Sequence, residues 1–169
     1  LRPTRLCGKC ALVPRANIIT STHGLDIEVL GKIPKGPCIL VANHLGYLDP
    51  VIIGSLIHCK PIAKSELGNW PLFGSCLSAL GIFFYVRGCV RSGVRVLLKS
   101  ISFLRNGESI LIFPEGTTTN GKQVLPFKRG IFGVSKITGI PVVPIRVEFM
   151  DESAAWWEAS DSFVSHYYR

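Results

Sequence analysis

Hydrophobic residues along the chain fall into short blocks separated by glycine, proline and polar residues. Short apolar runs that end at a loop predict strands buried on both faces, which are typical of parallel sheets. Blocks with apolar residues three and four positions apart predict helices instead. The expected strands are 38–42, 61–64, 82–86, 109–113 and 142–149, and the expected helices are 50–57, 71–80, 90–104 and 129–138. This alternation predicts an α/β fold with a mostly parallel central sheet flanked by helices.

Two further apolar stretches near the N-terminus, 18–21 and 27–30, surround the dipeptide His23-Gly24. A glycine-containing turn between two such stretches is a common hairpin signal. The sequence therefore predicts a β-hairpin in this region.

The strongest local pattern is that of the helix expected at 90–104, which Asn106 and Gly107 would end. Its basic residues recur four positions apart on one face, whereas its apolar residues follow another. The basic stripe is either a solvated face or a surface for an acidic carrier protein, coenzyme phosphates or anionic lipid head groups. The apolar residues are Val90, Val94, Leu97, Leu98, Ile101 and Leu104, and the basic residues are Arg91, Arg95 and Lys99.

Residues 67–86 contain no charged side chain and reach the length of about 20 residues that a membrane span requires. Polar residues, glycines and Trp70-Pro71 interrupt the segment, and it becomes β-branched and aromatic towards Val86. A short helix that leads into a buried strand is therefore the preferred interpretation. A true span and a shallow insertion into the membrane interface stay open as alternatives.

The composition is apolar and basic for a chain of 169 residues, a length that corresponds to about one domain. Hydrophobic residues make up 47% and the formal net charge is +8, while the mean hydropathy is +0.35. This balance favours anionic lipid surfaces or phosphorylated substrates. Nucleic acid is not expected as a partner, because no recognition-helix or RNA-binding aromatic motif is present. We expect a single domain over residues 1–169 that is a fragment of a longer protein, since the chain starts at Leu1.

Six cysteines are present, and four of them lie within apolar segments, where a thiol behaves as a small hydrophobic group. They do not follow the pattern of a disulfide framework, so a reducing compartment is expected. Cys7 and Cys10 form one C-x-x-C pair, but no second pair of zinc ligands follows at similar spacing. No metal site is therefore expected.

Two short polar stretches follow predicted strands. The first contains Asn43, His44 and Asp49, and the second runs over residues 113–117. Parallel strands bring the loops at their carboxyl ends to one edge of the sheet, where ligands usually bind. The sequence therefore predicts a site at the ends of strands 38–42 and 109–113.

His44 and Asp49 are five residues apart, and a continuous helix would separate their side chains by about 140°. A loop carrying His44 before a helix that begins at Asp49-Pro50 would bring them together, since Asp is a favoured N-cap and Pro a favoured first helical residue. His44 would then remove a proton from an attacking hydroxyl, while Asp49 would hold its ring. The alternative is that Asp49 only caps the helix and His44 is an ordinary loop histidine.

In the second stretch, Pro114 ends the strand and Gly116 permits a tight turn, which leaves Glu115 at the edge of the sheet. Glu115 either takes part in a site at this edge or pairs with a nearby arginine for structural reasons.

Four blocks of the sequence resemble, in order and spacing, the motif blocks of the glycerolipid acyltransferases. The best-known members of that family are the 1-acyl-sn-glycerol-3-phosphate (lysophosphatidic acid) acyltransferases. The blocks are 43–49 (NHLGYLD), 81–87 (GIFFYVR), 113–117 (FPEGT) and 143–145 (VPI), and the stretch 62–67 (IAKSEL) is similar to a further lysine-containing segment of the family. The resemblance covers about residues 25–150, the motif-bearing core.

The resemblance implies that His44 is the general base and Asp49 its partner. It implies transfer of a fatty acyl group from acyl-CoA or acyl carrier protein (acyl-ACP) to the hydroxyl of a lysophospholipid, in the first place 1-acyl-sn-glycerol-3-phosphate, which gives phosphatidic acid. The lysolipid, the acyl donor and the cytosolic face of a membrane are the expected partners, and no metal or bound cofactor is implied. The residues implied in substrate binding are Asn43, Lys64, Arg87 (at the acceptor's phosphate), Glu115, Gly116 and Thr117, with Val143, Pro144 and Ile145 shaping the acyl region.

One position departs from the family pattern. Many lysophosphatidic acid acyltransferases carry a basic residue directly after the FPEGT block, whereas this chain has Thr118. The acceptor could therefore be another lysolipid, such as a lysophospholipid with a larger head group or a lyso-ornithine lipid, unless Lys122, Lys128 or Arg129 supplies the charge. A thioesterase-type hydrolase and a non-catalytic lipid-binding protein are the alternatives from other classes.

Overall fold

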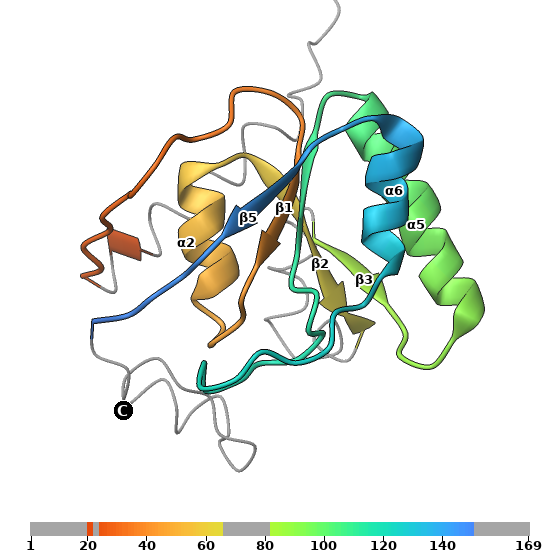
Figure 1. Ribbon diagram of the computed structural model, residues 1–169. Coiled ribbons are helices and arrows are strands. Elements are labelled where there is room, and N and C mark those ends of the chain that lie inside the picture. The colour runs from red at the N-terminus through yellow and green to blue at the C-terminus, as the bar shows by residue number, and fades with distance from the viewer. Residues whose placement is uncertain (1–19, 22–23, 66–81, 151–169) are drawn as a thin grey trace, which may run out of the picture.

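The computed structural model describes residues 20–21, 24–65 and 82–150 of the chain. Helices and strands follow one another as expected for an α/β fold (Figure 1). The elements are β1 (Ile39–Ala42), α2 (Asp49–Leu56), β2 (Cys59–Lys64), β3 (Phe83–Tyr85), α5 (Val90–Arg105), β4 (Ser109–Ile112), α6 (Gly130–Thr138) and β5 (Val142–Ile145).

These strands form a five-stranded sheet in the order β3-β2-β4-β1-β5, and each pair of neighbours is parallel. β1 lies between β4 and β5, with Val41 opposite Ile112 on one side and Pro144 on the other. All four residues of β1 are buried, as expected for a strand covered on both faces. Pro144 lacks a backbone N–H, and it is tolerated because β5 is an edge strand. The prediction of a mostly parallel sheet flanked by helices is confirmed.

Helices cover both faces of the sheet, with α2 on one face and α5 and α6 on the other (Figure 1). Side chains alternate along β1 because successive residues of a strand point to opposite faces. Leu40 belongs to the hydrophobic cluster that contains Ile53 of α2, whereas Ile39 belongs to the cluster that contains Leu104 of α5 and Ile131 of α6. These two clusters fill the middle of the sheet and leave its carboxyl edge to the polar loops.

α5 has the predicted helical spacing, but only part of its apolar face packs against the core. Leu104 is buried, and Leu97 and Ile101 pack against the cluster that α5 shares with α6. The other apolar residues face outward and flank the basic stripe of the same helix. The exposed fractions are 81% for Val90, 50% for Val94 and 63% for Leu98.

The hairpin expected at 18–21 and 27–30 is wrong. In the described part of that region, Thr20 and Ser21 are helical and residues 25–30 form no strand. Gly24 has φ +62°, and its N–H donates to the carbonyl of Ser21 while the N–H of Leu25 donates to the carbonyl of Thr20. A glycine in this left-handed conformation ends a helical turn as readily as it forms a hairpin turn, so the two share a sequence signal.

The strand expected at 142–149 is too long, because β5 ends at Ile145. Its neighbour β1 ends at Ala42, so the ladder between them has no further positions. The side chain of Asn43 instead bonds both backbone groups of Val147. The helix expected at 71–80 and most of the segment 67–86 lie outside the described residues. Within the described ranges, no helix combines the length and the hydropathy that crossing a membrane demands.

Two cysteines of the described chain lie inside the fold. Cys38 and Cys59 are buried, whereas Cys89 is exposed. Burial raises the pKa of the Cys38 thiol, and a hydrogen bond with Ser109 partly opposes the shift. Burial, together with the neighbouring Cys38, raises the pKa of the Cys59 thiol to about 12. Because the thiolate is the reactive form, only roughly one Cys59 in a thousand would be reactive at about pH 9.

We expect iodoacetamide to alkylate Cys89 in the folded protein and to leave Cys38 and Cys59 unmodified. Raising the pH to about 9 should not bring Cys59 into reaction, since its thiol stays protonated well above that pH. Peptide mapping by mass spectrometry measures the modification at each site. The same two cysteines should react once urea unfolds the chain, whereas alkylation of Cys59 in the native protein would contradict its burial beneath the helices.

Candidate active site

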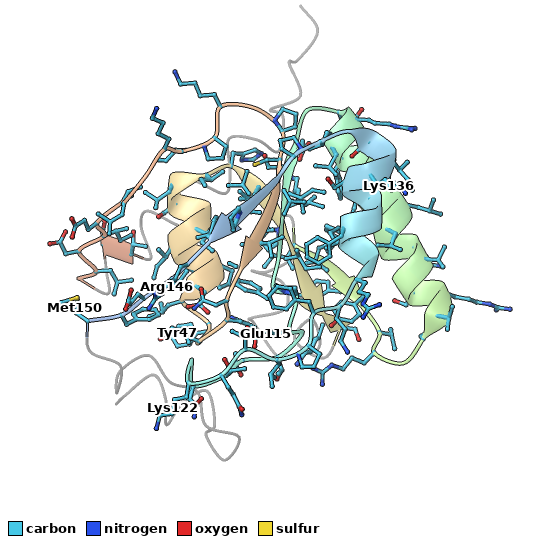
Figure 2. All side chains as sticks on the ribbon, in the orientation of Figure 1. Tyr47, Glu115, Lys122, Lys136, Arg146 and Met150 are labelled. Carbon is cyan, nitrogen blue, oxygen red and sulfur yellow. The ribbon has the colours of Figure 1, made fainter. Side chains whose placement is uncertain are left out.

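The two polar stretches meet at the carboxyl ends of β1 and β4. Val41 and Ile112 are partners in the parallel ladder, so the chain leaves the sheet at neighbouring points before His44 and Phe113. Figure 2 shows Glu115 at this same edge, below the ends of the strands. Loops at the carboxyl edge of a parallel sheet are the usual place for a ligand site.

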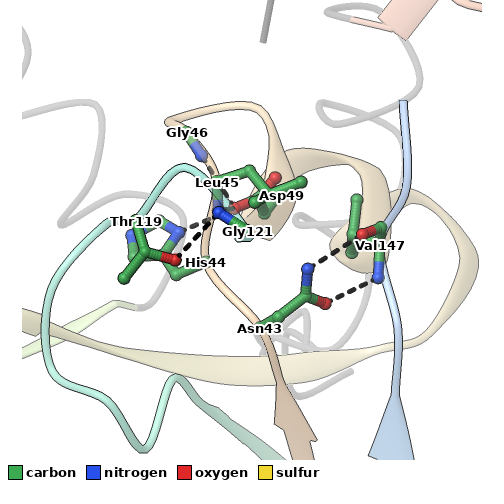
Figure 3. Close-up of polar contacts among 8 residues, drawn as sticks. All are labelled: Asn43, His44, Leu45, Gly46, Asp49, Thr119, Gly121 and Val147. Carbon is green, nitrogen blue, oxygen red and sulfur yellow. Dashed lines mark hydrogen bonds and ion pairs between the residues drawn. The ribbon is translucent and has the colours of Figure 1, made fainter. Parts of the chain in front are cut away.

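The carboxylate of Asp49 is fully buried and organises the loop that carries His44. Its Oδ2 accepts three hydrogen bonds, from the backbone N–H groups of Leu45 at 2.6 Å and Gly46 at 3.0 Å and from Nδ1 of His44 at 2.7 Å (Figure 3). An ionised carboxylate can only accept hydrogen bonds, so this contact requires Nδ1 of His44 as the donor, and in the neutral ring the lone pair is then on Nε2. The ring is thereby held in the tautomer that a general base requires.

The expected role of Asp49 as a helix cap is wrong. Leu48 is the N-cap of α2, no side chain caps this helix, and Asp49 is its first residue, followed by Pro50. Because its side chain bonds backwards to the turn, Asp49 closes a loop rather than a helix end. This geometry brings residues five apart into contact without placing both on the same helix.

The imidazole ring of His44 is supported from one side and reachable from solvent. It stacks on the ring of Phe113, with ring centroids 4.0 Å apart and planes inclined by 18°. The side chain of His44 remains 21% exposed. Aromatic packing on one face and the bond to Asp49 on one edge fix the ring orientation while leaving it accessible to a substrate.

Asn43 connects the loop after β1 to the segment after β5. Its Nδ2 donates to the carbonyl of Val147 at 2.9 Å, and its Oδ1 accepts from the N–H of Val147 at 2.8 Å (Figure 3). Beyond the end of the β1–β5 ladder, this side chain therefore takes the place of a backbone partner for Val147. The part in substrate binding that the resemblance implies for Asn43 stays a prediction.

The loop after β4 is closed over the site by two further contacts. Glu115 is buried, and its Oε2 accepts from the backbone N–H of Leu125 at 3.0 Å. The N–H of Thr119 donates to the carbonyl of His44 at 2.8 Å. Glu115 forms no ion pair with another described residue. The structural pair with an arginine, which the sequence left open, is therefore not found among these residues. The ion pairs are His44–Asp49, Lys60–Glu108 and Arg146–Glu148.

Arg87 lies two residues beyond the end of β3 and reaches the second polar stretch. Its Nη2 donates to the backbone carbonyl of Gly116. Gly116 has φ +71°, a conformation that favours glycine, as the tight turn predicted there requires. The structure therefore brings Arg87 and the 113–117 block together, although 29 residues separate them along the chain.

Lys64 and Thr117 also lie near the carboxyl edge. Lys64 is the last residue of β2, where it is paired with Tyr85 of β3. Thr117 is half-buried and follows the Gly116 turn. The roles in substrate binding implied for Lys64, Arg87, Glu115, Gly116 and Thr117 stay predictions, since the structure holds no substrate.

Sequence reasoning missed the contacts that hold the loop in place. Phe113 was part of a recognised block, but its stacking on His44 had no separate signal. Thr119 and Leu125 contribute backbone N–H groups, which any residue except proline would supply. In the part of the chain that the structure describes, no group of three His, Cys, Asp or Glu residues could hold a metal ion.

The chain is similar in sequence to enzymes that acylate lipids. The chain is 30% identical over 145 residues to a lyso-ornithine lipid O-acyltransferase of Pseudomonas aeruginosa, covering 83% of this chain and 56% of that protein. It is 36% identical over 123 residues to a chloroplastic 1-acyl-sn-glycerol-3-phosphate acyltransferase of Brassica napus, covering 71% of this chain and 36% of that protein. The chain thus spans between about a third and just over half of the length of these relatives.

A solved structure is similar over the same region. The 1-acyl-sn-glycerophosphate acyltransferase PlsC from Thermotoga maritima superposes with a TM-score of 0.63 at 29% identity, covering 79% of this chain and 54% of that chain. A family model described as Acyltransferase matches residues 25–148, which include all four motif blocks and the His44–Asp49 pair. The chain therefore belongs to the Acyltransferase family.

Proposed function

We propose that this chain is the catalytic domain of an O-acyltransferase that acylates a lysolipid. The acyl donor is acyl-CoA or acyl-ACP, and the acceptor is 1-acyl-sn-glycerol-3-phosphate, which becomes phosphatidic acid. The observation that carries the proposal is the 2.7 Å bond from Nδ1 of His44 to the buried carboxylate of Asp49, at the carboxyl edge of a sheet in a member of the Acyltransferase family.

The pair suits a direct transfer from a thioester to an alcohol. Nε2 of His44 removes the proton from the acceptor hydroxyl as its oxygen forms a bond to the thioester carbonyl carbon. The carbon–sulfur bond then breaks, and the imidazolium returns the proton to the departing thiolate, so that the products are an ester and a free thiol. Asp49 stabilises the imidazolium that forms in between.

The second candidate acceptor is a lyso-ornithine lipid. It is favoured by the name of the Pseudomonas aeruginosa relative and by Thr118, which stands where many lysophosphatidic acid acyltransferases have a basic residue. The position of Arg87 at the Gly116 turn favours a phosphorylated acceptor instead, because a guanidinium offers a forked set of donors to a phosphate.

We further infer that the protein associates with the surface of an anionic membrane, on its cytosolic face. α5 supports this, because its basic stripe lies beside outward-facing apolar residues and the helix contains no acidic residue. A helix face that combines apolar and basic side chains is typical of interfacial binding. The basic stripe consists of Arg91, Arg95 and Lys99, and the exposed apolar residues are Val90, Val94 and Leu98.

The reaction is tested with the intact protein, labelled acyl-CoA or acyl-ACP and a panel of acceptors. We expect labelled phosphatidic acid from lysophosphatidic acid, separated by thin-layer chromatography, at a higher rate than product from lyso-ornithine lipid or lysophosphatidylcholine. A higher rate with lyso-ornithine lipid would replace the proposed acceptor by the second candidate. Labelled free fatty acid with every acceptor would indicate a hydrolase, and no product at all would indicate a binding protein.

Replacing His44 with Ala removes the base and should lower kcat by about 10²-fold to 10⁴-fold or more. Asp49→Asn should also lower kcat by at least about 10²-fold, because the ring loses the acceptor that fixes its tautomer. The matched control is His58→Gln, which removes a half-buried histidine at the opposite end of the sheet, directly before β2, and should retain activity per folded molecule within about twofold. Thermal melts followed by circular dichroism separate lost chemistry from lost folding. Retained activity in folded His44→Ala would rule out the assigned base.

For the membrane surface, we expect the triple variant Arg91→Gln, Arg95→Gln, Lys99→Gln to bind vesicles containing phosphatidylglycerol up to about 100-fold more weakly, since each basic residue near an anionic surface contributes about 1 kcal/mol. Sedimentation with vesicles measures the partitioning. A triple variant with the same charge change elsewhere, Lys32→Gln, Lys35→Gln, Lys136→Gln, is the control. An equal decrease in both variants would show that net charge, rather than α5, governs binding.

A further inference from the structure

The turn at Gly116 is surrounded by polar groups from two other parts of the chain. A Cβ atom at this position would lie 3.5 Å from Cε and 3.9 Å from Cγ of Lys128, and 3.9 Å from the hydroxyl of Tyr85. The aliphatic stem of Lys128 therefore runs along the turn at van der Waals distance. Arg87 contacts the same turn through its bond to the Gly116 carbonyl.

The backbone holds Lys128 in this place. Its N–H donates to the carbonyl of Pro114 at 2.8 Å, which joins the end of the loop to its beginning. Lys128 thus lies beside the 113–117 block, although it follows the block by 11 residues. The turn is also close to His44, the proposed base. The N–H of Gly116 donates to the carbonyl of Phe113 at 3.0 Å, and the ring of Phe113 stacks on His44.

Two cationic side chains therefore lie at one turn, and within the described residues neither has an acidic partner there. Neither Arg87 nor Lys128 belongs to the ion pairs formed among the described residues. Glu115, the carboxylate directly before the turn, is buried and accepts a hydrogen bond from the backbone N–H of Leu125. Two adjacent cations repel each other, so an anion that bridges them is bound more favourably than by either cation alone.

We propose that Lys128 is a specificity-determining residue that binds the phosphate of the acceptor together with Arg87. This inference rests on the proposed acyl transfer and identifies which residue replaces the basic side chain missing at Thr118. The guanidinium supplies forked donors and the ammonium a compact charge, a combination that suits a phosphate monoester. In 1-acyl-sn-glycerol-3-phosphate the phosphate is attached next to the carbon that bears the reacting hydroxyl, so its site has to lie close to His44, as this turn does.

Lys128 is distinguished from the other two basic residues considered for this role. Atoms of its side chain are among the nearest to the Gly116 turn. Lys122 lies further along the loop, on the side away from α6 (Figure 2), where its N–H donates to the side chain of Asn120. Arg129 is the N-cap residue of α6 and is exposed, as Lys128 is, but none of its atoms is among the three nearest to a Cβ at Gly116.

The kinetic test uses Lys128→Met, which keeps the length of the stem and removes the charge. With lysophosphatidic acid we expect KM to rise about tenfold to a hundredfold while kcat changes less than about twofold, and we expect Lys128→Arg to restore most of the affinity. Lys136→Met, a lysine at the far end of α6 (Figure 2), is the matched charge control and should behave as wild type. An unchanged KM in Lys128→Met would overturn the proposal, and so would a fall in kcat that Lys128→Arg does not restore.

A binding test separates this inference from the proposed reaction, because it needs no turnover. Acetic anhydride labelling of the intact protein, read by mass spectrometry, measures the reactivity of Lys128 and Lys136 in the absence of acyl-CoA and acyl-ACP. We expect lysophosphatidic acid to slow acetylation of Lys128 at least about fivefold and monoacylglycerol with the same chain to leave it unchanged. Equal protection by both lipids would overturn the phosphate site. Protection by lysophosphatidic acid alone, in a protein that transfers no acyl group, would support the site and refute the proposed reaction.

Discussion

One buried carboxylate determines both the shape and the chemistry of the site. Asp49 is excluded from water, and burying a carboxylate is costly unless its oxygens find donors. The donors come from three consecutive residues, His44 to Gly46, so the loop has to curl around Oδ2. Oδ1 of the same carboxylate is buried and has no hydrogen-bond partner among the described residues, so Oδ2 alone holds the loop. The bond from Nδ1 of His44 to Oδ2 also orients the imidazole. The conformation of the loop and the orientation of the His44 ring therefore both depend on the carboxylate of Asp49.

The second buried carboxylate follows the same principle. Glu115 accepts from the backbone N–H of Leu125, as Asp49 accepts from backbone N–H groups of its own loop. Because the donors to these two acids are backbone amides and the histidine, the basic residues at the edge of the sheet are not neutralised by them. Arg87 and Lys128 therefore give the rim of the site a positive character even though it contains two acidic side chains.

Much of this arrangement could be predicted from local sequence. Continuous apolar runs specified the strands of the parallel sheet, and the polar residues directly after them identified its functional edge. The helix cap assigned to Asp49 was wrong because Asp-Pro has the same signal whether the carboxylate bonds forwards to the helix or backwards to a loop. The hairpin at Gly24 was wrong for a similar reason, since one glycine conformation serves two kinds of turn.

Other features depend on pairing between distant parts of the chain, which no local pattern encodes. The end of β5 at Ile145 is set by where β1 ends, and the outward position of Val90, Val94 and Leu98 is set by how α5 meets α6. The contact of Lys128 with the Gly116 turn likewise exists only because the loop closes on Pro114. Sequence spacing alone could name Lys128 among several basic residues but could not select it.

The position of β1 between β4 and β5 has a consequence for biosynthesis. β1 leaves the ribosome before its neighbours β4 and β5, which are translated about 70 and about 100 residues later. Both edges of an apolar strand thus stay open during synthesis, and pairings between distant segments form slowly. The nascent chain must keep this strand from aggregating until β5 emerges, and the loops around His44 cannot be assembled before then.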